Sequence, residues 1–267
     1  MEKLNRFVAK HHVPIYVICS VLWIALYWLT LEYLMLLALV LVCGCIFLTA
    51  RWLGGRWLAL LKKPMDILDN QCDPSPYLEE LQRQKDYSGP WTLRYNRTIC
   101  QAGALVMVGS PEEAYDLLLP LQKKLFQYQQ PRVMQSIYCN SMANTCRALD
   151  RAMEAEYWHA KYMELIAKVN NKRIQQVYAE RMPLYMAHYH TFRKEYDLSM
   201  QSLQQLKPKN MYEQVVAAMV YAQNYRAIGE TEKAKEALTF VADNGNKLYI
   251  ATRARQMLSE MEENTPA

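Results

Sequence analysis

A long apolar stretch near the start of the chain limits what the chain can fold into. Residues 11–50 contain one carboxylate, Glu32, and no lysine or arginine. A bilayer core of ~30 Å is crossed by about 20 apolar residues in a helix. Residues 13–31 and 33–50 each fit one crossing, and Glu32 lies between them. The stretch therefore predicts a transmembrane helical hairpin that turns at Glu32.

Basic residues flank this stretch on both sides. They are Lys3, Arg6, Lys10, Arg51, Arg56, Lys62 and Lys63. Short basic flanks are retained on the cytoplasmic side of a membrane. We therefore predict a multi-pass cell-membrane protein whose N-terminus and C-terminal domain are cytoplasmic. The seven cysteines include no CxxC pair, which is typical of free thiols in a reducing compartment.

The composition changes after residue 63. Residues 51–63 interleave tryptophan and arginine, which is typical of an interfacial segment, so residues 1–63 are predicted to form a membrane anchor. Residues 64–90 are punctuated by proline, aspartate and glycine, which indicates a connector. Within it, Asp73 or Ser75 can cap a short helix that extends to Gln84. Residues 91–267 form the remaining domain.

Apolar residues recur at intervals of three and four from residue 91 onward, which predicts helices rather than strands. The expected helices cover residues 91–108, 111–128, 131–148, 151–168, 172–193, 196–206, 211–228, 231–243 and 247–263. The turns between them carry recognisable signals. Gly109 is a helix stop, and Ser110, Pro111 and Glu113 then form a capping box. The predicted fold class is all-α.

Small residues repeat at fixed intervals within this helical region. Four copies share an alanine, a turn residue seven positions later and a second small residue five positions after that. The anchors are Ala102, Gly109, Ala114, Ala143, Ala155, Ala187, Ala222, Gly229 and Ala234. Asp150 and Lys194 occupy the turn position in the middle two copies. Two helices approach closely where side chains are small, so each copy predicts a helix pair, and such pairs stack into an α-solenoid.

This pattern resembles the tetratricopeptide repeat family, which has small residues at these helix positions and a glycine at the turn. The resemblance covers residues 91–243, with 247–263 as a closing helix. Pro183 leaves the register of the third copy open, because it either begins a helix or lies inside one that starts near Asn171. The alternative is an irregular bundle with chance spacing. With the hairpin, the pattern also resembles membrane-anchored repeat proteins of Gram-positive bacteria.

The resemblance implies that the first helix of each pair lines a concave, partner-binding face. The residues at the corresponding positions are Asn96, Asn140, Asn144, Arg147, Arg181, His188, Gln223 and Arg226. Asn140, Asn144 and Arg147 share one helix face, where amides would bind an extended peptide and the guanidinium a carboxylate. An ordinary solvated face is the alternative interpretation.

Reactive constellations are missing from the sequence. It contains no HExxH, no histidine pair at i, i+4 and no glycine-rich phosphate loop, so no metal, cofactor or nucleotide is predicted. Residues 91–267 hold 22 basic and 18 acidic residues, too balanced for a nucleic-acid partner. We therefore predict a non-catalytic, membrane-anchored scaffold or adaptor for an unidentified protein or peptide. The alternatives are a regulatory subunit of a small membrane transport or channel complex and, third, a membrane-tethered hydrolase.

Overall fold

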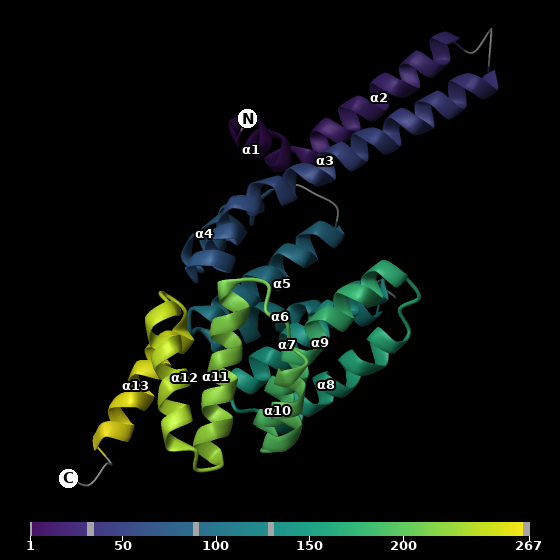
Figure 1. Ribbon diagram of the computed structural model, residues 1–267. Coiled ribbons are helices and arrows are strands. Elements are labelled where there is room, and N and C mark those ends of the chain that lie inside the picture. The colour runs from purple at the N-terminus through teal and green to yellow at the C-terminus, as the bar shows by residue number, and fades with distance from the viewer. Residues whose placement is uncertain (1, 31–34, 88–90, 128–130, 264–267) are drawn as a thin grey trace. The chain divides into compact units, whose positions relative to one another are not determined.

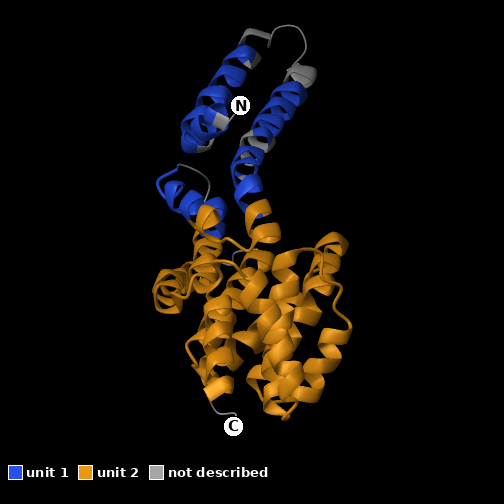
Figure 2. Ribbon diagram, turned by 60° about the vertical axis from the view of Figure 1, so that its left-hand side comes forward, with its two compact units in different colours: residues 1–65, 79–97 blue, residues 66–78, 98–267 orange. Residues whose placement is uncertain are grey.

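The structure is a computed structural model that describes residues 2–30, 35–87, 91–127 and 131–263. These residues form helices joined by turns, with no strand among them (Figure 1), which confirms the predicted all-α class. The chain divides into two compact units (Figure 2). Unit 1 contains residues 1–65 and 79–97, and unit 2 contains residues 66–78 and 98–267.

Unit 1 is built mainly from long apolar helices. Its first helices are α1 (Glu2–Lys10), α2 (His12–Thr30) and the part of α3 (Met35–Gln71) that extends to residue 65. In both views α2 and this part of α3 run alongside each other in opposite directions (Figures 1 and 2). The predicted turn at Glu32 lies outside the described residues. Among the described residues, we find no helix that combines the length and apolar character needed for a bilayer crossing.

Helix α3 continues through Pro64, at the predicted start of the connector, and residues 64–71 are helical. Proline removes one backbone hydrogen bond and disfavours a helix interior by about 3 kcal/mol. Leu61 and Leu68, about one turn before and after it, are buried at 2% and 6% exposure. Burial of each leucine contributes roughly 2 kcal/mol, which offsets the cost of the proline.

The rest of the chain consists of shorter helices, most of which form packed pairs. They are α4 (Ser75–Arg83), α5 (Trp91–Met107), α6 (Pro111–Gln127), α7 (Arg132–Ala148), α8 (Ala152–Ala167), α9 (Lys172–Phe192), α10 (Tyr196–Gln204), α11 (Met211–Ala227), α12 (Thr231–Asn244) and α13 (Tyr249–Glu263). Each begins and ends within two residues of its predicted range. In unit 2, α7 packs on α8, α9 on α10, α11 on α12, and α12 on α13. This succession of helix pairs fits an α-solenoid.

Four turns between paired helices share one backbone geometry. The turn residue has a positive φ in each, with 89° at Gly109, 55° at Asp150, 62° at Lys194 and 82° at Gly229. The next residue donates its backbone N–H to the carbonyl five positions earlier, as Ser110 does to Leu105 at 2.9 Å. This is the Schellman motif, which satisfies carbonyls at a helix end. The four copies are therefore aligned in the register that the small residues predicted.

Replacement of Lys194 with glycine is expected to stabilise the protein. A side chain at positive φ costs about 1 kcal/mol relative to glycine, and Lys194 is exposed with a φ of 62°. We expect the free energy of unfolding to rise by about 0.5–1 kcal/mol in chemical denaturation of the full-length chain. Gly229→Ala is the matched opposite: its φ is 82° and the space around a Cβ is open, so it should lose a similar amount. A destabilised Lys194→Gly variant would contradict the turn assignment.

The small anchor positions are buried in all four helix pairs. On the first helices, Ala102, Ala143, Ala187 and Ala222 are 0% exposed, and on the second helices Ala114, Ala155, Ser199 and Ala234 are at most 2% exposed. Four positions after the second anchor, three copies have a buried leucine: Leu118, Leu203 and Leu238. His159 occupies that position in the second copy. The second repeat therefore has a polar side chain at a position where the other three repeats have a buried leucine.

Helix α9 resolves the register of the third copy. It begins at Lys172 after the cap residue Asn171, whose side chain accepts a 3.2 Å hydrogen bond from the backbone of Ile174. Pro183 lies inside this helix and therefore does not begin it. Of the two interpretations, the longer helix is correct, and Ala187 keeps its place as the first anchor of the pair.

The turn that precedes α13 contacts residues from the beginning of unit 2. A Cβ atom at Gly109 would lie 2.6 Å from Cδ2 of Tyr249. Asn246 donates a 2.8 Å hydrogen bond to the carbonyl of Gln71, and Lys247 pairs with Asp73 at 2.8 Å. The two ends of the helix-pair array are therefore in contact, which the small-residue spacing did not predict.

Candidate partner-binding site

The predicted partner-binding residues lie on the first helices of the pairs. Asn96 is on α5, Asn140, Asn144 and Arg147 are on α7, Arg181 and His188 are on α9, and Gln223 and Arg226 are on α11. Asn96 belongs to unit 1, and the other seven belong to unit 2. Asn144, Arg181 and Arg226 are exposed, whereas the others are half-buried.

Arg147 lies at the centre of the best defined group. Its Nη2 donates a hydrogen bond to Oδ1 of Asn144, which is three residues earlier on the same face of α7. Its guanidinium carbon lies 5.0 Å from the centre of the Tyr185 ring. Tyr185 is on α9, so the next repeat supplies a cation–π partner that shields the guanidinium from water.

The positive charge of Arg147 is not balanced by a nearby acid. Within the described residues, no carboxylate pairs with it, and its neighbours are the amide of Asn144 and the rings of Tyr185 and Tyr189. Its Nη1 is buried without a hydrogen-bond partner, and so is Oδ1 of Asn140. Burial lowers the pKa of Arg147, but a guanidinium stays protonated at neutral pH. A buried unpaired group costs roughly 1–3 kcal/mol, which an incoming acceptor would recover.

Two histidines beside Arg147 are held neutral. Burial lowers the pKa of His188 to about 3 and that of His159 to about 4, and the charge of Arg147 adds to both effects. A 2.8 Å hydrogen bond joins Nδ1 of His159 to the hydroxyl of Tyr185. The His159 ring also stacks on Tyr189. We use the name Arg147 cluster for Asn140, Asn144, Arg147, His159, Tyr185 and His188.

His159 and Tyr185 were not among the predicted site residues. A signal for His159 exists in the repeat alignment, because it replaces a leucine that the other three copies keep. A polar residue at a position that is apolar in the other repeats indicates a candidate functional residue in that repeat. Tyr185 carries no comparable signal. Its importance comes from its contacts with α7 and α8, which its own helix does not reveal.

The remaining predicted residues have other surroundings. Arg226 forms a 3.5 Å ion pair with Glu260 of α13. Burial raises the pKa of Asp69, and the charge of Arg181 opposes this rise. In the described part of the chain, no contact links Arg181, Gln223 or Arg226 to Arg147. The structure therefore brings Asn144 and His188 to Arg147. Asn140 lies two turns before Arg147 on the same face of α7, and the other predicted residues lie outside the cluster.

The chemical groups near the cluster are suited to binding through hydrogen bonds and charge. Burial raises the pKa of Cys139 to about 12 and that of Cys146 to about 11. These thiols are therefore protonated at neutral pH, and a thiol is a far weaker nucleophile than a thiolate. Within the ranges that the structure describes, no group of three or more His, Cys, Asp or Glu residues is arranged to hold a metal ion.

Comparison with known proteins assigns no family to the chain. The sequence matches no protein-family model, and no curated protein or solved structure matches it either. Among the described residues, the Arg147 cluster contains two buried polar atoms without hydrogen-bond partners, Nη1 of Arg147 and Oδ1 of Asn140.

Proposed function

We propose that the protein is a membrane-anchored, non-catalytic scaffold that binds a partner protein at the Arg147 cluster. In this proposal α2 and the apolar part of α3 form the anchor, and the helix pairs of unit 2 carry the binding surface. The repeated small residues, which resemble the tetratricopeptide pattern, support a role in protein binding. Repeat arrays provide extended surfaces for partners, because each helix pair adds a similar face.

The exposed apolar side chains of unit 1 support the anchor. Leu22 and Trp28 on α2 are 63% and 69% exposed, and Val40 and Phe47 on α3 are 63% and 66% exposed. Burial of such a side chain would contribute roughly 1.5–3 kcal/mol, which exposure to water forgoes. A lipid environment recovers this energy without any protein partner. The basic flanks place both chain ends and unit 2 on the cytoplasmic side in this proposal.

The observation that carries the binding proposal is the unpaired Nη1 of Arg147. A carboxylate oxygen is the acceptor that a guanidinium binds most strongly. Oδ1 of Asn140, also buried and unpaired, requires a donor, and a backbone N–H supplies one. A peptide that carries an Asp or Glu side chain next to an exposed backbone amide satisfies both atoms. The proposed ligand is therefore an extended acidic segment of a partner protein.

Arg147→Gln is expected to weaken binding of an acidic peptide at least tenfold without destabilising the protein. Loss of one member of a close charge pair costs about 2 kcal/mol or more of binding free energy. Removal of a buried charge that has no carboxylate partner relieves its desolvation cost, which offsets the loss of the hydrogen bond to Asn144 and of the contact with Tyr185. The measurement is fluorescence anisotropy of the tightest binder from an array of acidic and neutral decapeptides, together with thermal unfolding of each variant.

Arg226→Gln is the matched control for this experiment. Arg226 occupies the same position relative to its anchor alanine but already pairs with Glu260. It should therefore bind the peptide as the unchanged protein does. The proposal is wrong if no acidic peptide binds, if both variants bind equally, or if Arg147→Gln lowers stability, since the last result would give the arginine a structural role.

A further inference from the structure

The outward face of α1 has no role in the scaffold proposed above. Leu4 and Phe7 on this face are 53% and 58% exposed although both side chains are large and apolar. Lys3 and Lys10 are exposed beside them. At about 100° per residue, these four side chains lie within about 120° of the helix circumference. One face of α1 therefore combines two apolar side chains with two positive charges.

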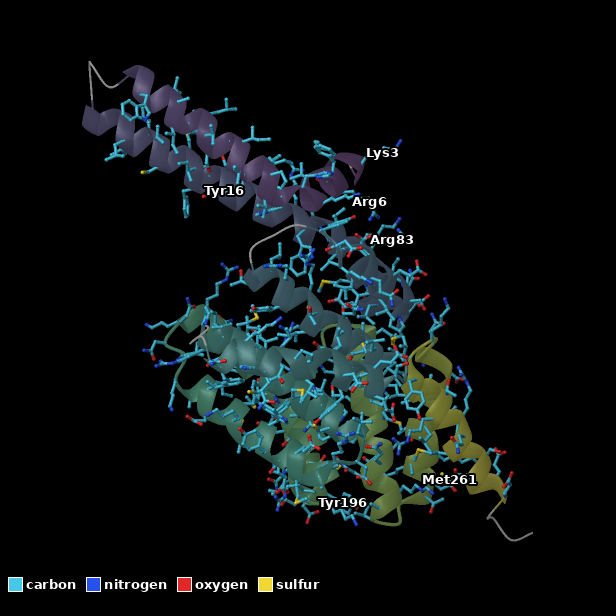
Figure 3. The ribbon with its side chains drawn as sticks, turned by 180° about the vertical axis from the view of Figure 1, so that it is seen from behind. Lys3, Arg6, Tyr16, Arg83, Tyr196 and Met261 are labelled. Atoms are coloured by element: carbon cyan, nitrogen blue, oxygen red, sulfur yellow. The ribbon has the colours of Figure 1, made fainter. Side chains whose placement is uncertain are left out.

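The opposite face of α1 is bound to the rest of unit 1. Val8 is 3% exposed. Arg6, which is labelled in Figure 3, pairs with the carboxylate of Glu80 at 2.6 Å, and Oδ1 of Asn5 accepts a 2.5 Å hydrogen bond from Arg56. These contacts determine the rotation of α1 about its axis and leave its apolar and basic face outward.

We infer that Lys3, Leu4, Phe7 and Lys10 lie in the headgroup layer of an anionic lipid surface. The inference rests on the proposed anchor, because α1 is joined to α2 through His11 alone. The exposed apolar surface continues along the chain into α2, where Val13 and Val17 are 40% and 52% exposed. An amphipathic helix with lysines beside its apolar side chains binds at the boundary between acyl chains and anionic headgroups.

The contact partner of α1 on α3 has the same interfacial character. The guanidinium of Arg56, which binds Asn5, lies 4.4 Å from the centre of the Trp52 ring, and Trp52 is 46% exposed. Tryptophan is enriched at membrane interfaces, where lysine and arginine reach the lipid phosphates. The hydrogen bond between Asn5 and Arg56 therefore keeps α1 next to the interfacial residues Trp52 and Arg56 of α3. Contact with a lipid surface accounts for both the exposed apolar side chains and the two lysines of this face. Contact with water would account only for the lysines.

Hydroxyl-radical footprinting of the full-length chain tests the inference. The protein is placed in nanodiscs of phosphatidylcholine alone or with about one third phosphatidylglycerol, and mass spectrometry gives the oxidation rates of Phe7, Trp28 and Tyr157. Tyr157 of α8 is 58% exposed and serves as the reference. We expect the Phe7 rate to fall at least threefold in the anionic nanodiscs. Trp28 should be protected in both, and Tyr157 should not change.

Charge variants make the test specific. Lys3→Gln with Lys10→Gln should abolish the difference between the two lipids at Phe7, whereas Lys172→Gln with Lys207→Gln, two exposed lysines of unit 2, should preserve it. Equal Phe7 rates in both lipids, with Trp28 protected, would overturn the inference and leave the anchor in place. If Trp28 is oxidised as fast as Tyr157, the anchor proposal itself fails and the inference fails with it.

Discussion

Ala187→Leu is expected to lower the free energy of unfolding by about 3 kcal/mol, a fall of roughly 9 °C in the unfolding midpoint. Ala187 is 0% exposed and packs against Leu203 of α10 and against Ala217 and Val220 of α11. Its carbonyl accepts a 2.9 Å hydrogen bond from the hydroxyl of Ser199. Three added carbon atoms would push apart both the helix pair and the next repeat. Chemical denaturation of the full-length chain, followed by circular dichroism, measures the loss.

The control for this substitution is Ala179→Leu on the same helix. Ala179 is exposed, so the added side chain meets water and the change in unfolding free energy should stay within about 0.5 kcal/mol. Equal effects at the two positions would mean that close helix approach does not depend on the anchor alanines. A large effect at position 187 alone would support the repeat as the unit that determines packing.

Acidification from pH 7.5 to 5.0 is expected to remove about 2–4 kcal/mol of stability through His159 and His188. Their pKa values in the folded protein, about 4 and about 3, lie below the ordinary value of 6.5. Below pH 6.5 the unfolded chain therefore binds protons that the folded chain does not. The stabilisation is present above pH 6.5 and is lost as the pH falls toward about 4 for His159 and about 3 for His188. Denaturation at a series of pH values measures this slope.

The double variant His159→Gln, His188→Gln isolates the histidine contribution. Carboxylates that also titrate in this range are common to both proteins, so their effects cancel in the difference. The variant should lose about 2–4 kcal/mol less than the unchanged protein between pH 7.5 and 5.0. Identical slopes for the two proteins would show that the folded state does not suppress protonation of these histidines.

The helices could be predicted from the sequence because their signals are local. The recurrence of apolar residues at intervals of three and four can be recognised within a single helix. Gly109 and Gly229 mark two of the turns, because glycine readily adopts the positive φ found there. Asp150 and Lys194 adopt the same geometry without that signal. Their turns were placed correctly because the buried alanines on both sides preserve the spacing. Pro64 lies inside α3, where the burial of Leu61 and Leu68 offsets the cost of a proline in a helix.

The sequence identified a set of equivalent positions for the binding residues, but it did not show which of these positions lacks a partner within the protein. Arg147 and Arg226 have the same position relative to their anchors, so the sequence does not distinguish them. They differ because α13 brings Glu260 to Arg226, whereas α9 brings the ring of Tyr185 to Arg147. The helices and their register follow from local periodicity and small-residue spacing. Which arginine lacks a counter-ion depends on contacts between helices far apart in the chain, because charge pairing acts over a few ångströms and only packing creates such proximity.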